Sequence, residues 1–442
     1  MKTLAIISNK LIRIIGKLVG KGSSLPGQVA LKVDKDILSK IKLPKYIIAV
    51  TGSNGKTSTV EMIYQVLNNA GLSVAYNKEG SNQIEGVTTL ILDNCDLNGN
   101  FKKDVLLIES DERYARHTFK YFHPTHYVIT NLYRDQLTRN GHPEWIYNII
   151  KESIYPETTL ILNGDDPLVS MFKDLSNTKT YFFGVDRYSD STNESIATYN
   201  DGKYCPKCNH KLIYEYYHYN HIGKFKCPNC NLGNNEIDFK ITEANLDEAY
   251  LIIDNKYKIN LSLNSIYNAY NILATYSICR LLDVDTDIIC NTLNNYILKN
   301  GRVRQFKVGN YEGTLLTSKH ENSVSYNQSL RVAKNHKGDV TAFIMVDAIS
   351  RKYFTSETSW LWDIDFELLN NSNIKKIVLT GLYVSDIATR LEYTGIDFNK
   401  IYIEKDIEKA IDYLKDNTIG YIYVITCFSD QDKFLNRVEV IQ

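Results

Sequence analysis

The stretch KYIIAVTGSNGKTSTVEMIYQVLNNAG, residues 45–71, decides the fold of this chain. Its first part, 46–50, is a short apolar run containing β-branched residues, which predicts a buried strand. The segment TGSNGKTS, 51–58, is rich in Gly, Ser and Asn and predicts a turn. Apolar residues then recur at helical spacing as far as Gly71, a residue suited to end a helix. The sequence therefore places a polar, glycine-bearing loop where a strand passes into a helix.

A loop in this position is suited to hold phosphate. Gly52 and Gly55 allow backbone N–H groups to face an anion, and the helix N-terminus adds positive potential. Lys56 is placed to reach the β- and γ-phosphates of a nucleotide, and the hydroxyl of Thr57 is placed to bind Mg²⁺. The first glycine of the common GxxxxGK[ST] pattern is replaced by Val50. An ordinary turn between strand and helix is the alternative interpretation.

Length and charge limit the class of protein. A chain of 442 residues predicts about three domains at roughly 150 residues per domain. The 51 basic and 51 acidic side chains cancel, whereas a generic nucleic-acid-binding protein usually has a basic excess. The sequence shows neither a convincing cleavable signal nor an apolar run of about 20 residues that would span a membrane. We therefore expect a cytoplasmic protein without a transmembrane segment.

The first 22 residues have a distinct composition. They contain five basic side chains and no acidic one. Their apolar residues follow helical spacing and are Leu4, Ile7, Leu11, Ile14, Ile15 and Leu18. A basic amphipathic helix of this kind can lie on an anionic membrane. The alternative is a helix that packs its apolar face on the body of the protein.

From residue 72 to about 300, strand and helix patterns alternate, which predicts a mostly parallel sheet with right-handed crossovers. Strand candidates over 105–108, 126–129 and 159–162 are each followed by polar residues. These polar clusters are 109–112, Asn131 with Arg134 and Asp135, and 163–166. Because ligands bind at the carboxyl ends of parallel strands, the three clusters predict a nucleotide and metal site at one sheet edge. Helix capping is the alternative role for each cluster.

Residues 201–236 interrupt this alternation with clustered cysteines. Cys205 and Cys208 form CPKC, and eighteen residues later Cys227 and Cys230 form CPNC. This spacing is typical of a four-cysteine zinc ribbon, and a reducing compartment favours metal binding over disulfides. Four sulfur ligands complete the shell, so we expect a structural rather than a catalytic Zn²⁺. The other polar residues of note in the segment, which we expect at the surface, are His210, His218 and His221.

Residues 261–282 predict a helix that carries Asn264, Asn268 and Asn271 on one face. Asparagine is a poor residue for a helix interior. We therefore interpret the repetition as a site that hydrogen bonds a nucleotide base, with a merely exposed polar face as the alternative. After the segment 300–302, strand and helix patterns resume and predict a second, smaller α/β domain.

Together these motifs resemble the Mur ligase family, whose members are ATP-dependent ligases that activate a carboxylate as an acyl phosphate. The motifs are TGSNGKTS, Glu109, TNLYRDQL, ILNGDDPL, YNAYN and Gly-Arg at 301–302. The resemblance implies that Lys56 and Thr57 hold the ATP phosphates and Mg²⁺, and that Glu109 binds Mg²⁺. It further implies that Asn268 and Asn271 bind the adenine and that Arg302 contacts phosphate from the interdomain hinge. The implied nucleotide-binding residues are Gly52, Asn54, Gly55, Lys56, Thr57, Ser58, Asn268, Asn271 and Arg302.

Within that family, the chain is similar to the ligase subunit of lipid II isoglutaminyl synthase. The similar features are the lead-in over 23–38, the inserted four-cysteine ribbon, and TSWLWDIDFE over 358–367. This resemblance implies amidation of the α-carboxylate of D-glutamate in lipid II, with ammonia supplied by a separate class I glutaminase of the GatD type in a heterodimer. It also implies that a carboxylate of the C-terminal domain completes the partner's Cys–His pair. Asp363 is the candidate, with Asp347 and Asp365 as alternatives.

The resemblance implies three parts: a helical lead-in over 1–44, a central ATP-binding domain over 45–300 and a C-terminal domain over 301–442. The ribbon would be inserted into the central domain. Two other functions remain open from the sequence. One is another Mur-type ligase that adds an amino acid, such as a folylpolyglutamate-like enzyme. The other is a zinc-ribbon NTPase that binds nucleic acid, which the neutral charge disfavours. For lipid II as substrate, the expected location is the cytoplasm, at the inner face of the membrane.

Overall fold

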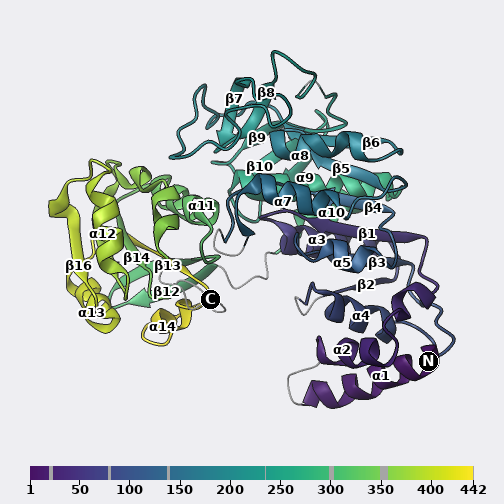
Figure 1. The fold of residues 1–442 in the computed structure, drawn as a ribbon. Coiled ribbons are helices and arrows are strands. Elements are labelled where there is room, and N and C mark those ends of the chain that lie inside the picture. Colours follow the sequence, from purple (N-terminus) through teal and green to yellow (C-terminus); the bar gives the residue numbers. More distant parts are fainter. Residues whose placement is uncertain are drawn as a thin grey trace. The chain divides into compact units, whose positions relative to one another are not determined.

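The computed structural model describes residues 1–18, 23–77, 81–136, 140–233, 235–297, 303–348 and 357–441. The chain divides into two compact units, drawn in Figure 1. The first unit consists of Met1–Tyr133, His142–Ile196 and Asn200–Leu298, and the second of Arg134–Gly141, Ala197–Tyr199 and Lys299–Gln442. Two short stretches from the middle of the sequence therefore belong to the same unit as the C-terminal part of the chain.

The first unit is built on a nine-stranded sheet of order β11-β10-β9-β6-β5-β4-β1-β3-β2. Its strands are β1 Tyr46–Thr51, β2 Val74–Tyr76, β3 Val105–Glu109, β4 His126–Ile129, β5 Thr159–Asn163, β6 Thr180–Val185, β9 Phe239–Asn245, β10 Tyr250–Ile253 and β11 Tyr257–Asn260. Pairing is parallel from β2 across to β9, which confirms the predicted parallel sheet. Strand β1 lies between β3 and β4, so the loop that follows it is flanked by the ends of both neighbours.

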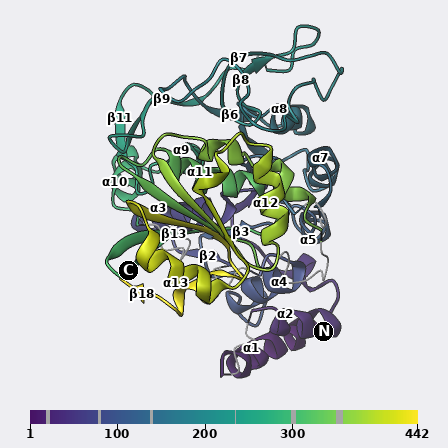
Figure 2. The same cartoon turned by 90° about the vertical axis from the view of Figure 1, so that its left-hand side faces the viewer.

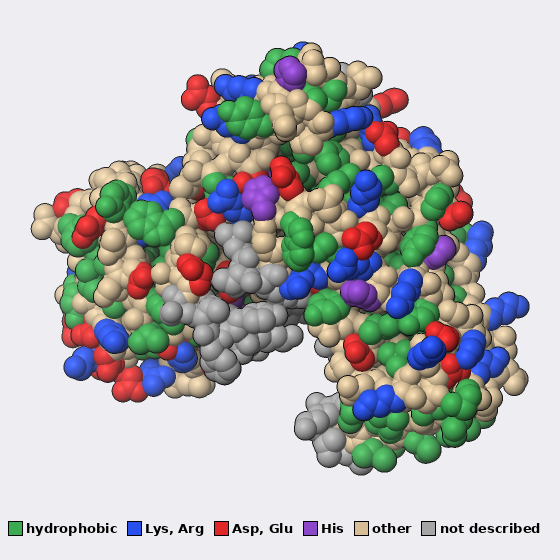
Figure 3. Space-filling view, in the orientation of Figure 1, with side chains coloured by type: hydrophobic (Ala, Val, Ile, Leu, Met, Phe, Trp, Pro, Cys, Tyr) green, Lys and Arg blue, Asp and Glu red, His purple; other side chains and the backbone are tan. Residues whose placement is uncertain are grey.

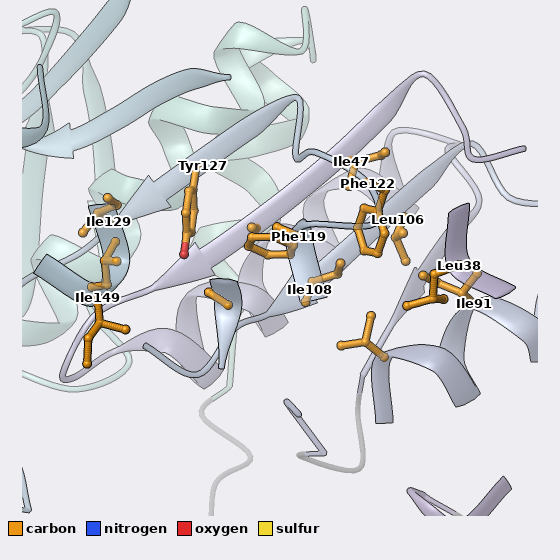
Figure 4. Packing of buried hydrophobic residues seen from close by; sticks show 14 of the residues in the cluster. Leu38, Ile47, Ile91, Leu106, Ile108, Phe119, Phe122, Tyr127, Ile129 and Ile149 are labelled. Atoms are coloured by element: carbon orange, nitrogen blue, oxygen red, sulfur yellow. The ribbon is translucent and has the colours of Figure 1, made fainter. Parts of the chain in front are cut away.

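Helices cover both faces of this sheet. They are α1 Lys2–Leu18, α2 Leu25–Val33, α3 Lys56–Asn69, α4 Ile84–Asp93, α5 Ala115–Phe119, α7 Pro143–Lys151, α8 Pro167–Ser170, α9 Ile266–Leu281 and α10 Thr286–Asn294, with 3₁₀ turns η1 Ile37–Lys40 and η2 Met171–Leu175. Alternate strand residues such as Ile47, Leu106 and Ile129 pack in one core with α4, α5 and α7 (Figure 4). Helices α3 and α9 pack against each other, α3 on β1, β2 and β3 and α9 on β4, β5, β6 and β9. The lead-in helices α1 and α2 pack on α4.

An antiparallel hairpin is inserted between β6 and β9. Its strands are β7 Ile213–Tyr219 and β8 Ile222–Lys226, and they form a separate two-stranded sheet. The hairpin and its flanking turns have a small core of their own, made by Leu212, Phe225 and Leu232 together with the cysteines. The four-cysteine insertion predicted from the sequence is therefore a distinct substructure.

The second unit is a seven-stranded sheet of order β16-β15-β14-β17-β13-β12-β18. Its elements are β12 Val303–Val308, β13 Tyr311–Ser318, α11 Ser323–Lys334, β14 Val340–Met345, η3 Ser359–Asp363, η4 Phe366–Leu369, β15 Ile374–Thr380, α12 Val384–Glu392, η5 Phe398–Lys400, β16 Ile401–Glu404, α13 Ile407–Asn417, β17 Tyr421–Cys427, α14 Gln431–Leu435 and β18 Glu439–Val440. Helices α11 and α12 pack on one face and α13 on the other (Figure 2). Helix α14 packs in the same core as α13. The predicted second α/β domain is confirmed.

The predicted helix over 261–282 is wrong at its start. Helix α9 begins at Ile266, because the hydroxyl of Ser265 accepts a hydrogen bond from the backbone N–H of Tyr267 and caps the first turn. Asn264 therefore precedes the helix and does not share a helical face with Asn268. Ser265 is a favoured N-cap residue, so the start of the helix has a signal in the sequence itself.

Candidate nucleotide-binding site and metal centre

The segment 51–58, here called the loop, runs from the end of β1 through a turn at 52–55 into the first turn of α3, as predicted. Gly52 has φ of 133° and Gly55, the N-cap residue of α3, has φ of 85°, conformations that favour glycine. A Cβ at Gly52 would lie 2.2 Å from the hydroxyl oxygen of Thr130, and a Cβ at Gly55 would lie 2.1 Å from Oδ1 of Asn271. The two glycines thus allow both the turn and the close approach of neighbouring side chains.

Residues at the end of β4 brace the loop. The backbone N–H of Asn54 donates to Oδ1 of Asn131 at 2.8 Å, and Nδ2 of Asn131 donates to the carbonyl of Asn54 at 3.1 Å. The hydroxyl of Thr130 donates to that same carbonyl at 2.8 Å. The backbone N–H of Ser53 donates to the carbonyl of Asn131 at 2.9 Å. Asn131, from the second predicted polar cluster, therefore lies at the loop and holds it in place.

The ammonium group of Lys56 is buried at the mouth of the loop. It donates to the carbonyl of Gly52 and forms an ion pair with Glu112. Only 8% of the Lys56 side chain and 6% of the Glu112 side chain are exposed. The sequence motifs assign Glu112 no separate role. Its position three residues after Glu109, in the same polar cluster, is the feature of the sequence that indicates a place at this site.

Thr57 and Glu109 lie side by side on neighbouring elements. The Thr57 hydroxyl donates to Oε1 of Glu109 at 3.1 Å. The backbone of Glu109 is fixed by Asn77, whose Nδ2 donates to its carbonyl at 3.0 Å and whose Oδ1 accepts from its N–H at 2.8 Å. Mg²⁺ prefers oxygen ligands of this kind, carboxylate and hydroxyl, with water and phosphate completing the shell. The donor set at this point fits a magnesium ion.

The predicted base-binding asparagines lie on α9. Asn271 contacts Gly55, and Asn268 lies one turn earlier with 3% of its surface exposed. Nδ2 of Asn268 donates to the carbonyl of Leu263 at 3.3 Å, while its Oδ1 is buried without a hydrogen-bond partner among the described residues. Ser58 lies in the first turn of α3. Arg302 lies outside the described residues.

The third polar cluster has a different role from the one predicted. Asp166 caps α8 by accepting from the N–H groups of Leu168 and Val169, as the helix-capping alternative predicts. Asp165 accepts from the hydroxyl of Tyr270 at 2.6 Å and from the N–H of Val185 at 2.8 Å. Burial raises the pKa of Asp165 to about 6. Asp166 therefore stabilises the start of α8, and Asp165 links the backbone of β6 to Tyr270 of α9.

The four clustered cysteines converge in the ribbon. Sulfur atoms of Cys205, Cys208, Cys227 and Cys230 all lie within 4.8 Å of one another, and none is in a disulfide. The backbone N–H of Asn229 donates to the sulfur of Cys227 at 3.5 Å. A hydrogen bond from the backbone N–H of His210 lowers the pKa of Cys208 to about 5, which favours the thiolate form. Four converging sulfurs with backbone donors fit a tetrahedral zinc ion.

The surface position expected for the ribbon histidines is wrong for two of them. His210 is exposed, but His218 and His221 are buried. His218 contacts the hydroxyl of Ser191 and the carbonyl of Val185, and burial lowers its pKa to about 4. His221 lies with Nε2 3.7 Å from Oδ1 of Asp166. Their burial comes from packing of the hairpin against the sheet, which the spacing of the cysteines does not reveal.

In the second unit, the three candidate carboxylates differ in their surroundings. Asp363 forms an ion pair with Arg134 at 2.8 Å, and 16% of its side chain is exposed. Asp365 is 3% exposed and accepts from the N–H of Thr198 at 2.7 Å and from Nδ2 of Asn327 at 2.7 Å. Asp347 accepts from the N–H of Leu382 and from Lys433. Asp365 is thus a fully engaged structural group, and Asp363 retains surface.

Both units match known proteins. The Mur ligase middle domain matches residues 50–233, and the MurT ligase C-terminal domain matches 320–430. The fold resembles a pseudomurein peptide ligase type C from Methanothermus fervidus, with a TM-score of 0.69 at 20% identity, covering 91% of this chain and 80% of that one. Together the parallel sheet with its glycine-bearing loop and the second α/β unit define a protein of the Mur ligase fold.

Curated relatives identify the branch of that class. The MurT subunit of lipid II isoglutaminyl synthase (glutamine-hydrolyzing) from Staphylococcus aureus strain COL is 32% identical over 92% of this chain and 90% of the relative. The subunit of the same description from Streptococcus pneumoniae strain R6 is 30% identical over 98% and 96%. This chain therefore belongs to the MurT family of ligases. Across the described residues, no helix has the length and apolar character needed to cross a bilayer.

Proposed function

We propose that this chain uses ATP to convert the α-carboxylate of D-glutamate in the stem peptide of lipid II into the amide, giving D-isoglutamine. A carboxylate oxygen attacks the γ-phosphorus of ATP, forming an acyl phosphate and releasing ADP. Ammonia then attacks the acyl carbon, and inorganic phosphate leaves. The observation that carries the proposal is the braced phosphate loop with buried Lys56, in a chain that matches lipid II isoglutaminyl synthase subunits over nearly its full length.

The residues of the loop supply what phosphoryl transfer needs. The Lys56 ammonium is placed to exchange its Glu112 partner for a phosphate oxygen, so that a positive charge meets the negative charge of the transferring group. Thr57 and Glu109 would hold Mg²⁺, which supplies further neutralisation of phosphate charge. The unpartnered Oδ1 of Asn268 is an acceptor suited to an exocyclic amino group of adenine.

The nucleophile in this proposal comes from a partner. A class I glutaminase of the GatD type would release ammonia from glutamine in a heterodimer with this chain. Asp363 is our candidate for the carboxylate that orients the partner's Cys–His pair, because it lies in the segment 358–367 that resembles the ligase subunit. Its side chain retains surface, as does that of Asp347, whereas Asp365 is buried and fully bonded. Such a carboxylate stabilises the charged form of the histidine, as the third member of a catalytic triad does. Substitution of Asp363 by Asn should lower glutamine hydrolysis by the complex and spare ammonia-dependent amidation.

The ribbon would hold a structural Zn²⁺ through Cys205, Cys208, Cys227 and Cys230. All four positions would be filled by sulfur, so the ion would serve folding rather than catalysis. We place the whole reaction in the cytoplasm, at the inner face of the membrane, where a lipid-linked precursor is available.

An isotope experiment tests the proposal. The purified chain and a GatD-type glutaminase are incubated with ATP, Mg²⁺, glutamine and lipid II whose D-glutamate α-carboxylate carries ¹⁸O. We expect amidated lipid II, with one label transferred to inorganic phosphate for each product formed, since an acyl phosphate passes one carboxylate oxygen to phosphate. Label that stays out of phosphate, or ADP formation that does not depend on lipid II, would contradict the proposed chemistry.

Nucleophile competition separates the other Mur-type functions. Single amino acids and ammonium chloride are offered in place of glutamine, and the products are identified by mass spectrometry. We expect a product only with ammonia. A product extended by an amino acid would favour an amino-acid ligase, and tight retention of RNA or DNA on filters at moderate salt would favour the nucleic-acid-binding alternative.

A further inference from the structure

Helix α1 presents an apolar face away from the protein. The residues Ala5, Ile6 and Asn9 on its inner side are buried against the first unit. The outer residues, here called the α1 apolar face, are Leu4, Ile7, Leu11, Ile14 and Ile15. Four of them, Leu4, Leu11, Ile14 and Ile15, each leave 57–65% of their surface exposed. Scattered exposed apolar side chains are ordinary, but five on one helical stripe are not.

The charge on this helix has one sign. Lys2, Lys10 and Arg13 lie on α1, which has no acidic residue, while the chain as a whole is neutral. Arg13 is neutralised by an ion pair with Asp93. Lys2 and Lys10 donate to backbone carbonyls, which carry no charge, so their positive charge is uncompensated by those contacts. Figure 3 shows the apolar side chains along the lower edge of the molecule, over α1.

We propose that the α1 apolar face docks on an anionic lipid bilayer, with α1 lying in the plane of the interface. The inner side of α1 is already packed on α2 and α4, so the helix is held on the protein and offers only its outer side. Apolar side chains enter the boundary between headgroups and acyl chains, and the net positive charge of α1 attracts anionic headgroups. Docking would bring the enzyme to a substrate that is itself membrane-anchored, and this benefit rests on the proposed function.

The charge pattern also decides between a bilayer and a second copy of this chain. The spacing of Leu4, Ile7, Leu11 and Ile14 would suit a two-helix seam. However, pairing two α1 helices would set lysines of one copy against those of the other with no acidic residue on either helix, which is unfavourable. An anionic bilayer both accommodates the apolar side chains and attracts the positive charge of α1.

Vesicle flotation tests the proposal with the full-length chain and no substrate. Wild-type protein is mixed with vesicles of phosphatidylcholine alone or of phosphatidylcholine with phosphatidylglycerol. We expect flotation with the anionic vesicles, weakened by high salt, and little with the neutral ones. Replacing Leu11 and Ile14 together by Gln should lower the partition coefficient by roughly tenfold or more, because two apolar side chains no longer enter the interface.

Two controls keep the result specific. Ile403→Gln removes an apolar side chain that is 44% exposed in the second unit and should leave flotation unchanged. Thermal unfolding of the Leu11 and Ile14 variant should match the wild type, since both side chains are exposed. Equal flotation of variant and wild type, or failure of the wild type to float, would overturn the proposal. A wild-type dimer in solution that this variant dissociates would assign the face to a second copy instead.

The outcome is separable from the proposed activity. With lipid II in detergent, the Leu11 and Ile14 variant should amidate as fast as the wild type, and only with lipid II in anionic vesicles should it be slower. A chain that floats but does not amidate in either form would refute the proposed function and leave the docking inference standing.

Discussion

The loop 51–58 and the cysteine ribbon, both in the first unit, differ in what stabilises them. The loop 51–58 follows the central strand β1 and is braced by Thr130 and Asn131 from the neighbouring strand end. The core cluster of the ribbon itself is small and consists of Leu212, Phe225 and Leu232 with the cysteines. The large core of the first unit sets the shape of the loop, whereas we propose that a bound zinc ion fixes the shape of the ribbon. Substitutions in the loop should therefore mainly lower activity, whereas substitutions of the ribbon cysteines should unfold the ribbon.

The largest effect is expected from removing a ribbon ligand. In Cys205→Ser, zinc binding should be lost, and with it a metal contribution that is on the order of 10 kcal/mol in isolated zinc-binding peptides. Hydrogen exchange should accelerate throughout 201–233 while β1, β3 and β4 stay protected. Zinc content by mass spectrometry and exchange protection check both points. A metal-free variant with a fully protected ribbon would show that packing alone suffices.

Removing the loop lysine should destroy activity without unfolding the sheet. Lys56→Ala deletes the charge that we propose meets the transferring phosphate, so kcat for amidation should fall by roughly a hundred- to a thousandfold. The variant also leaves Glu112 buried without its cation, which lowers stability. Adding Glu112→Gln should restore the melting temperature and not the activity. Steady-state kinetics and calorimetry measure the two effects, and Lys415→Ala on the exposed side of α13 serves as the matched control.

The packing between ribbon and sheet predicts an acid-sensitive step. Burial lowers the pKa of His218 from 6.5 to about 4, so the folded protein keeps this ring neutral where an unfolded chain would protonate it. The corresponding stability is present above pH 6.5 and is lost as the pH falls towards 4. Between these values the wild type should lose up to about 3 kcal/mol more unfolding free energy than His218→Gln. Urea titrations across this range that run parallel for both proteins would exclude the effect.

A smaller effect is expected from loosening the loop itself. Asn131→Ala removes two hydrogen bonds to Asn54, each worth about 1 kcal/mol, so the KM for ATP should rise by roughly tenfold with little change in melting temperature. Asn131→Asp keeps the hydrogen-bond acceptor and loses the donor, so its KM for ATP should lie between those of the wild type and Asn131→Ala. If both variants bind ATP as well as the wild type, the bracing from β4 is not what orders the loop.

Much of this architecture was predictable because it depends on local patterns. Apolar runs gave β1, β3, β4 and β5, and the glycines with Lys56 and Thr57 marked the loop. The cysteine spacing predicts a four-sulfur cluster, which the structure contains. These features are written in consecutive residues or in short repeats, so no tertiary knowledge is needed to find them.

The parts that escaped prediction depend on contacts between distant residues. The ion pair of Glu112 with Lys56 and the burial of His218 and His221 join residues far apart in sequence. Arg134 and Thr198 come from the middle of the chain yet bond Asp363 and Asp365 in the second unit. Sequence periodicity does not reveal that 134–141 and 197–199 belong to the second unit, because each segment is only a few residues long and has no repeating pattern.

We propose that the loop between β1 and α3 holds the nucleotide whose energy drives amide formation. A crystal structure with a non-hydrolysable ATP analogue and Mg²⁺ tests it most directly. The account predicts phosphates against the N–H groups of 52–57, Lys56 moved from Glu112 to a phosphate oxygen, and the metal beside Thr57 and Glu109. Nucleotide bound elsewhere, with this loop empty and the Lys56–Glu112 pair intact, would contradict it.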